Sequence, residues 1–334
     1  MSPRVSTSWA GERIVYHLHD DASGASASIL PSYGFNLFDL RLPVNGEVRA
    51  VVASEPGFAE NPSRPARNGF PILFPFPGRI RDARFTFAGI AYELAPNKPP
   101  HAIHGFAHEA NWDVIEHGVE HGSATLIGRF QISRNAPEAL HRWPADAILE
   151  ITYRLAGSKL TLDASVTNPT ERPLPWGFGL HSYFRFPFDG REDRSTTRLV
   201  VDASEFWVLS DSLPTGERRP VDGTPLDYRR GLSMADLLAD DALTGLSSDP
   251  NGNARLIDEA LGAELRLTYG NTIREMVIFT PSGSAGIVAV EPYTQMADGF
   301  SLRDRGIDAG MRILAPGESD ELELSFESIP IELG

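Results

Sequence analysis

Two residues, His181 and Glu291, combine chemical type and sequence context in a way that suits proton transfer. His181 lies in the aromatic segment 175–187, where two glycines leave room for a ligand or another backbone to come close. Glu291 follows the small and β-branched run 286–290 and precedes Pro292, at which we expect that strand to stop. A carboxylate in that place is half desolvated, and desolvation raises its pKa toward the range of a general base.

Structural interpretations of these residues stand beside the chemical ones. His181 could be a core histidine with one satisfied hydrogen bond. Glu291 could form a structural ion pair, for instance with Arg79. Arg79 follows the segment 68–78, in which three prolines exclude a helix and argue against a central strand. A guanidinium on such a stiff, extended chain can grip hydroxyls or a carboxylate with several donors, and a structural salt bridge is the alternative.

Three histidines occur within residues 97–108, and their spacing raises the question of a metal site. Prolines before them and Gly105 after His104 disfavour a helix, and in an extended chain His101 and His104 point to opposite faces. The chain also lacks an H-E-x-x-H signature. We therefore expect no metal here, and we expect His104 to hydrogen-bond a polar ligand.

Short runs of alternating apolar and polar residues predict the elements that must position these groups. Residues 148–155 and 160–166 alternate and are joined by a Gly-containing connection, which is typical of a hairpin. Residues 264–269 and 321–326 alternate in the same way. Helical periodicity is scarce, and the best helix candidate is the short segment 233–238. The charged stretch 189–197 is expected to be a solvated loop. The pattern predicts an all-β protein, a large antiparallel β-sandwich formed as a single domain over residues 1–334.

Composition excludes several classes of function. Hydrophobic residues make up 41% of the 334 residues, enough for a substantial core. The net charge of −15 argues against nucleic-acid or anionic-membrane partners. There are 0 cysteines, so disulfides, thiolate metal ligands and a cysteine nucleophile are impossible. Residues 1–10 lack the apolar core of a signal peptide, and no apolar run approaches membrane-spanning length. We expect a soluble cytoplasmic protein.

Four segments, in this order, resemble the aldose 1-epimerase (galactose mutarotase) family. They are the segment 68–79 that ends in Arg79, His104-Gly105-Phe106, Gly179-Leu180-His181-Ser182-Tyr183-Phe184, and Glu291-Pro292-Tyr293-Thr294. The flanking segments 34–37 and 314–318 also match, so the resemblance runs from about residue 14 to about residue 329. It implies the galactose mutarotase-like supersandwich, an open cleft across one face, and no cofactor.

The resemblance also implies roles for particular residues in interconverting the α- and β-anomers of a hexose. His181 falls on the family's acid, Glu291 on its base, and Arg79 and His104 on substrate-binding positions. An aspartate that holds sugar hydroxyls falls within residues 240–246, where Asp240 is the first choice and its neighbour Asp241 remains open. We expect Glu291 to favour a protonated histidine partner. Aromatic side chains are expected to stack on the pyranose, namely Phe74, Phe76, Trp176 and Tyr183.

Three alternatives stay open at this point. A branch of the family acts on hexose 6-phosphates, and Arg81 and Lys98 lie near the site segments, where they could meet a phosphate. A non-catalytic carbohydrate-binding protein could share the fold, although the presence of both an acid and a base favours an enzyme. A two-carboxylate glycosidase is disfavoured because only one carboxylate stands in a strong segment. The expected partner is a monosaccharide, bound by a monomer or a homodimer.

Overall fold

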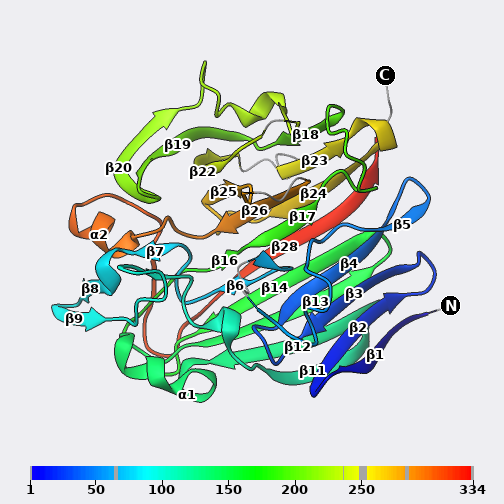
Figure 1. Ribbon diagram of the computed structural model, residues 1–334. Coiled ribbons are helices and arrows are strands. Elements are labelled where there is room, and N and C mark those ends of the chain that lie inside the picture. The colour runs from blue at the N-terminus through cyan, green and yellow to red at the C-terminus, as the bar shows by residue number, and fades with distance from the viewer. Residues whose placement is uncertain (1, 64–66, 236, 248–253, 283–285, 332–334) are drawn as a thin grey trace.

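The computed structural model describes residues 2–63, 67–235, 237–247, 254–282 and 286–331. Nearly all of its regular structure is antiparallel β-sheet (Figure 1). Within these ranges there are two short α-helices, α1 (Ile132–Asn135) and α2 (Gly299–Asp304). Single 3-10 segments are Arg81–Ala83, Ala107–Glu109, Pro137–Arg142, Tyr228–Arg230 and Glu259–Leu261. The prediction of an all-β antiparallel sandwich is confirmed.

Three large sheets form the body of the protein. A five-stranded meander runs in chain order through β1 (Pro3–Ala10), β2 (Arg13–Asp20), β3 (Ala25–Leu30), β4 (Asn36–Val44) and β5 (Glu47–Ala50). The nine-stranded sheet has the order β11 (Asp113–Glu120), β12 (Ser123–Gln131), β13 (Ile148–Ala156), β14 (Lys159–Thr167), β28 (Ser319–Pro330), β24 (Ala263–Tyr269), β23 (Ala254–Asp258), β18 (Thr197–Val200) and β21 (Leu232–Ser233).

The third sheet, of eight strands, matters most for the site. Its order is β20 (Leu213–Pro220), β19 (Ala203–Ser210), β22 (Asp240–Leu246), β25 (Glu275–Phe279), β26 (Ile287–Tyr293), β16 (Gly179–Leu180) and β6 (Ile72–Leu73), and β17 (Ser182–Arg185) also pairs with β26. The described residues also form three two-stranded sheets: β7 (Arg79–Ile80) with β10 (Ala102–Ile103), β8 (Arg84–Phe87) with β9 (Ile90–Glu93), and β15 (Leu174–Trp176) with β27 (Arg312–Leu314).

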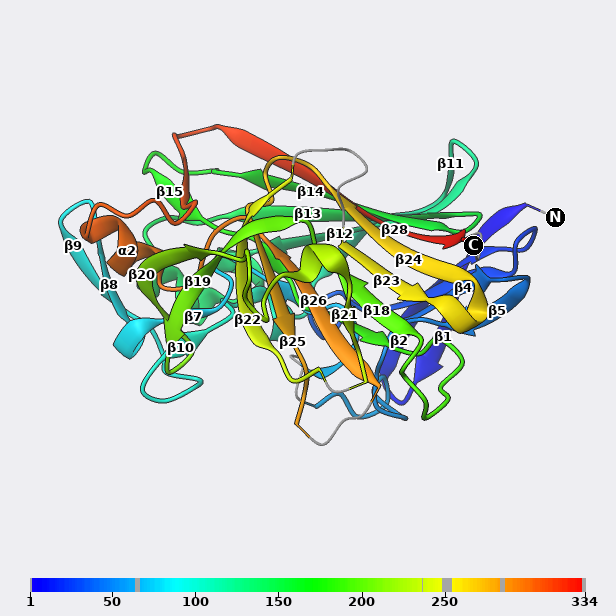
Figure 2. The ribbon, with the colours of Figure 1, turned by 90° about the horizontal axis from the view of Figure 1, so that it is seen from above.

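The sheets pack as layers because each buries one face. In β13 and β14 every second residue is buried, and the predicted hairpin of these strands is confirmed by their register from Ile148–Thr167 to Ala156–Lys159. Figure 2 shows β12, β13, β14 and β28 as one layer, with β22, β25 and β26 running across it. Phe326 of β28 packs on Phe70 and Phe184 with ring centroids 4.8 and 5.9 Å apart, which joins the layers. The main core cluster draws on residues 18 to 326, and the single domain stays a prediction.

Two predictions about local structure are wrong. The helix expected over 233–238 does not form: Leu232 and Ser233 are a strand paired with β18, and residue 236 lies outside the described residues. Nucleating a helix is costly, and here the edge strand β18 supplies backbone hydrogen-bond partners instead. The strand that was to stop at Pro292 runs on to Tyr293. It can do so because β26 has no ladder pair with β16 or β17 between Gly179–Tyr293 and Ser182–Val290, although the register is the same on both sides, so a proline there removes no ladder bond.

Two further findings concern the surface. In the charged stretch 189–197, Asp189, Glu192, Asp193 and Ser195 are exposed as expected, although Arg191 is held by buried Asp258 at 2.6 Å. None of the helices in the described ranges is long and apolar enough to cross a membrane.

Candidate active site

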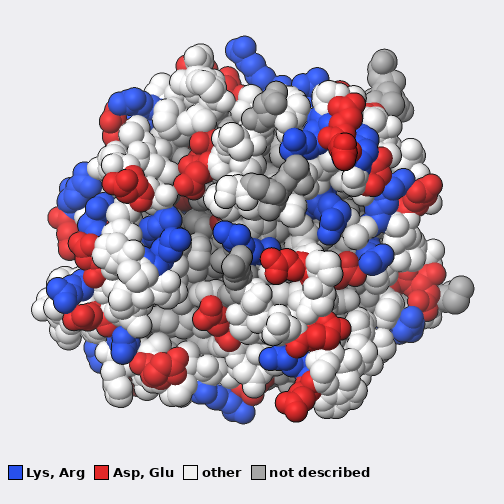
Figure 3. Space-filling view, viewed as in Figure 1, with Lys and Arg blue, Asp and Glu red and all other residues white. Residues whose placement is uncertain are grey.

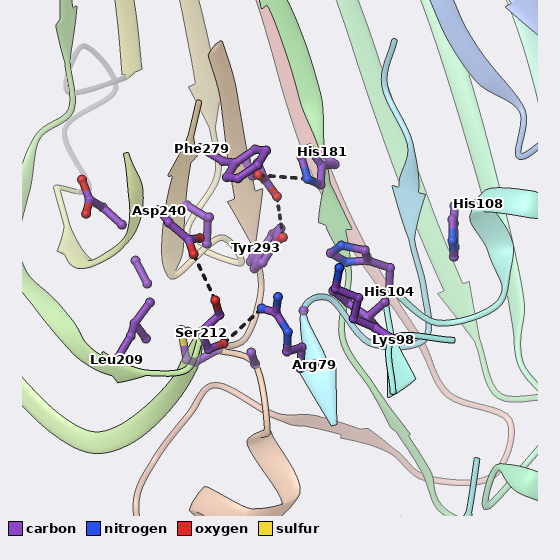
Figure 4. A pocket seen from close by; sticks show the side chains of 18 of the residues that line it. Arg79, Lys98, His104, His108, His181, Leu209, Ser212, Asp240, Phe279 and Tyr293 are labelled. Atoms are coloured by element: carbon purple, nitrogen blue, oxygen red, sulfur yellow. Dashed lines mark hydrogen bonds and ion pairs between the residues drawn. The ribbon is translucent and has the colours of Figure 1, made fainter. Parts of the chain in front are cut away.

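His181 and Glu291 meet on one face of the eight-stranded sheet. The pairs Gly179–Tyr293 and Ser182–Val290 keep one register, which sets His181 opposite Glu291 with both side chains on the same face. Nε2 of His181 lies 3.2 Å from Oε1 of Glu291 (Figure 4). The two residues are only 6% and 1% exposed. Two side chains from segments more than a hundred residues apart therefore form a single acid–base pair, and the alternative ion pair of Glu291 with Arg79 is wrong.

A cavity of about 460 Å³ opens over this pair. All five residues to which the sequence assigned roles line it, namely Arg79, His104, His181, Asp240 and Glu291. Small-molecule sites typically have volumes of about 300–1,000 Å³. The cavity can thus hold a ligand the size of a hexose, with the carboxylate and the imidazole at its floor.

The electrostatics of the pair correct one expectation. Burial lowers the pKa of His181 to about 3, so its neighbour does not keep the imidazole protonated as the sequence suggested. Burial raises the pKa of Glu291 well above its usual value. The hydrogen bond from Tyr293 lowers that pKa, but its effect is smaller than that of burial. With Glu291 protonated and His181 neutral, the pair holds one proton, the same number as in the charged pair. Moving that proton between the two groups needs no exchange with solvent.

Arg79 reaches the cavity from β7 (Figure 4). Its Nη1 donates to the carbonyl oxygen of Ser212 at 3.2 Å, in the turn between β19 and β20. The preceding residue must be a glycine, because a Cβ on Gly78 would lie 2.6 Å from Cβ of Ala297. The guanidinium keeps donors that can meet the hydroxyls of a ligand.

His104 is held in a left-handed backbone conformation with φ of 68°. Its amide donates to the carbonyl oxygen of Gly78 at 2.9 Å, and a Cβ on Gly105 would lie 2.1 Å from the carbonyl oxygen of Phe74. The imidazole of His104 stands edge-on to that of His181, with ring centroids 5.6 Å apart. Burial and then the charge of His181 hold the pKa of His104 well below its usual value. Neutral imidazole can both donate and accept a hydrogen bond.

The structure separates the two adjacent aspartates. Both line the cavity, but Asp240 is exposed and accepts a hydrogen bond from Oγ of Ser212 at 3.1 Å. Asp241 is occupied by the hydroxyl of Tyr228 at 2.7 Å. Asp240 is therefore the carboxylate that is available to a ligand. Ser212, which the sequence did not single out, links Asp240 to Arg79.

The aromatic residues of the cavity differ from those predicted. Phe74, Phe76 and Trp176 are buried in the core and do not line the cavity. Tyr183 does line it, together with Phe279 and Tyr293, which were not predicted. Tyr293 donates from its hydroxyl to Oε2 of Glu291 at 2.5 Å. Residues 276–279 of β25 are all apolar, so the sequence shows no alternation of apolar and polar residues there. It therefore could not predict that Phe279 faces the cavity.

Some of the other cationic and histidine side chains near the site segments line the cavity, and others are held outside it. Arg81 binds Asp298 at 3.1 Å and does not line the cavity, whereas Lys98 and Arg67 do. His101 lies away from His104 and accepts from the backbone amide of Asp82. Among the described residues no group of three or more His, Asp or Glu side chains could hold a metal ion.

Solved structures share this architecture. A galactose mutarotase-like protein from Clostridium acetobutylicum matches with a TM-score of 0.89 and 22% identity over 99% of both chains. Galactose 1-epimerase from Lactobacillus acidophilus matches with a TM-score of 0.77 and 16% identity over 99% of this chain and 100% of that one. These similarities define the fold as the galactose mutarotase-like β-sandwich.

Sequence comparison then gives the family. Residues 15–327 match the family model described as aldose 1-epimerase, so the chain belongs to the aldose 1-epimerase family. Galactose mutarotase from Homo sapiens is 27% identical over 173 residues, 50% of this chain and 47% of the human protein. The chain thus spans about half the length of the curated mutarotases that it matches. The uncharacterized protein YphB from Escherichia coli is 26% identical over 272 residues, 77% of this chain and 82% of that protein.

Proposed function

We propose that this chain is an aldose 1-epimerase that interconverts the α- and β-anomers of a hexose. The observation that carries the proposal is the contact of His181 Nε2 with Glu291 Oε1 at 3.2 Å on the floor of a hexose-sized cavity. Simple sugar binding needs no buried acid–base pair, and burying one costs stability. The pair therefore favours catalysis over a binding role.

The reaction requires two proton transfers that this pair can perform together. In the productive form the single proton of the pair sits on His181, which leaves Glu291 as the base. Glu291 takes the proton of the anomeric hydroxyl while the bond from the anomeric carbon to the ring oxygen breaks, and His181 gives its proton to that ring oxygen. Rotation of the open-chain aldehyde presents its other face. The same groups then act in reverse to close the ring, so no proton is gained or lost overall.

The substrate is held by groups on three sides of the pair. Arg79 and His104 offer donors from one side, and the exposed carboxylate of Asp240 accepts from the hydroxyls on the other. Phe279 and Tyr183 supply the aromatic surface on which a pyranose face can pack. We propose a monosaccharide as substrate because a few fixed polar groups on a largely apolar wall suit one sugar ring.

Polarimetry of freshly dissolved α-glucose and α-galactose tests this function directly. The wild-type protein should bring optical rotation to its equilibrium value faster than the spontaneous reaction. Binding of these sugars without any acceleration would instead establish a carbohydrate-binding protein.

A second candidate, hexose-6-phosphate 1-epimerase, is favoured by two further cations. Lys98 and Arg67 line the cavity and are exposed at its rim. Figure 3 shows side chains of both charges around the hollow at the centre of this face. If a phosphate binds there, the 6-phosphates should be the better substrates, with a rate advantage that falls as salt screens the attraction. Lys98→Met should then lower kcat/KM for the phosphate and leave the free sugar unaffected.

A further inference from the structure

Two tyrosines flank the acid–base pair at matching positions. Tyr183 follows His181 by two residues and Tyr293 follows Glu291 by two, so each lies on the same face of the sheet as the group it flanks. Their contacts differ in strength. The hydroxyl of Tyr293 donates to Oε2 of Glu291 at 2.5 Å, whereas the hydroxyl of Tyr183 lies 3.4 Å from Nε2 of His181. Tyr183 instead stacks its ring on that of His181, with ring centroids 4.5 Å apart, so the short hydroxyl contact is the one to Glu291.

The sheet is built to accommodate the ring of Tyr293. Gly179 is its cross-strand neighbour on β16, and a Cβ on that glycine would lie 2.6 Å from Cδ1 of Tyr293 and 2.8 Å from Cβ of Pro77. Tyr293 itself is 3% exposed. Since the ring fills the space where the side chain of residue 179 would stand, the glycine fixes the position of the hydroxyl against Glu291.

We propose that Tyr293 is a positioning residue that stabilises the ionised, productive form of Glu291 and directs its Oε1 toward His181. The inference rests on the proposed epimerase function and adds a residue to its machinery. A hydrogen bond donated to a carboxylate favours the charged form, so this bond opposes the burial of Glu291. The phenol remains a donor because burial, and then the charge of Glu291, raise the pKa of Tyr293 well above its usual value.

Other ionisable groups near Glu291 also bear on its titration. Those on the elements around it are His181, His104, Tyr183, Arg79, Asp240 and Glu275. Asp240 acts against ionisation and raises the pKa of Glu291. Glu275, the cross-strand neighbour of Tyr293, is buried and bonded to Trp207, and burial raises its pKa to about 7. The titration of Glu275 must be separated from that of Glu291, so the measurements are made in a Glu275→Gln background, where the alkaline limb is assigned to Glu291.

The test is the pH dependence of kcat/KM for anomer interconversion in Tyr293→Phe. Glu291 loses the single proton of the pair on the alkaline limb of the profile, so loss of a hydrogen bond to its charged form should move that limb upward by about one to two pH units. Gly179→Ala, which keeps the tyrosine but pushes its ring away, should shift the limb in the same direction and provides a second variant if the first does not fold.

Tyr183→Phe is the matched control, because it makes the same chemical change beside His181. The alkaline limb of Tyr183→Phe should stay at the wild-type position. A loss of activity in Tyr293→Phe that is equal at every pH, or an unshifted limb in both test variants, overturns the proposal. A wild type without mutarotation is a different result, since it refutes the proposed function. In that case the pKa of Glu291 can still be measured from its carboxylate infrared band, which is identified by its loss in Glu291→Gln. Tyr293→Phe should raise that pKa, and an unchanged pKa would refute the proposal.

Discussion

Replacing Glu291 with glutamine should separate catalysis from stability. The amide keeps the shape of the carboxylate, can accept the hydrogen bond of Tyr293 through its oxygen, and can donate to Nε2 of His181. Neither neighbour is left unpaired, so below pH 4.5, where the carboxyl group of Glu291 is protonated in the folded and the unfolded chain, the free energy of unfolding should change by no more than about 1 kcal/mol. The amide cannot take a proton, so kcat should fall by about a hundred- to ten-thousand-fold. That loss corresponds to about 2.7 to 5.4 kcal/mol in the activation barrier.

The sign of the pH dependence follows from the raised pKa of Glu291. A carboxyl group whose pKa is higher in the folded protein than in the unfolded chain binds its proton more tightly in the fold, so its contribution to stability falls as pH rises above the unfolded value. Glutamine removes this contribution. The free energy of unfolding of Glu291→Gln minus that of wild type should therefore increase, so that the variant becomes relatively more stable, as pH rises above 4.5, the ordinary pKa of glutamate.

The assays are polarimetry for kcat and urea denaturation at several pH values for stability. Glu264→Gln is the matched control, because Glu264 is 2% exposed but pairs with Arg266 and Arg255 away from the cavity. It should lose stability, since breaking a buried pair leaves its partners unsatisfied, and should keep its kcat. His181→Asn should lose activity on the scale of Glu291→Gln, and the double variant should be little worse than either. Should Glu291→Gln retain more than about a tenth of the wild-type kcat, the glutamate is not the base and the mechanism fails.

Arg79→Lys should raise KM by about tenfold with a smaller effect on kcat, because a point charge replaces a fork of several donors; Michaelis kinetics that do not change would mean that Arg79 is only structural. His104→Gly should have a free energy of unfolding about 1 kcal/mol higher than His104→Ala, because φ of 68° strains any residue with a Cβ. Equal urea midpoints for these two variants would contradict that reasoning. Dialysis against a chelator should leave activity intact, since the chemistry needs only proton transfer, and recovery of a lost activity by added zinc or manganese would show a metal requirement.

The sequence by itself determined much of the outline of this protein. Alternation of apolar and polar residues predicted the hairpin of β13 and β14 and the last strand, because side chains in a strand point alternately to its two faces whatever the tertiary context. Residue type and order pointed to five residues that the structure does bring into one cavity. Their roles in binding and catalysis remain predictions.

Only the tertiary structure decided how those residues interact. The approach of His181 to Glu291 depends on the register of strands far apart in the chain, and so does the break that lets β26 continue through Pro292. The choice between two adjacent aspartates depended on which one Tyr228 occupies. Burial is likewise a property of the whole fold, which is why the direction of the pKa shift of His181 could not be read from its neighbours in sequence. Local pattern specifies the face on which a side chain lies, whereas packing between distant segments decides what that face meets.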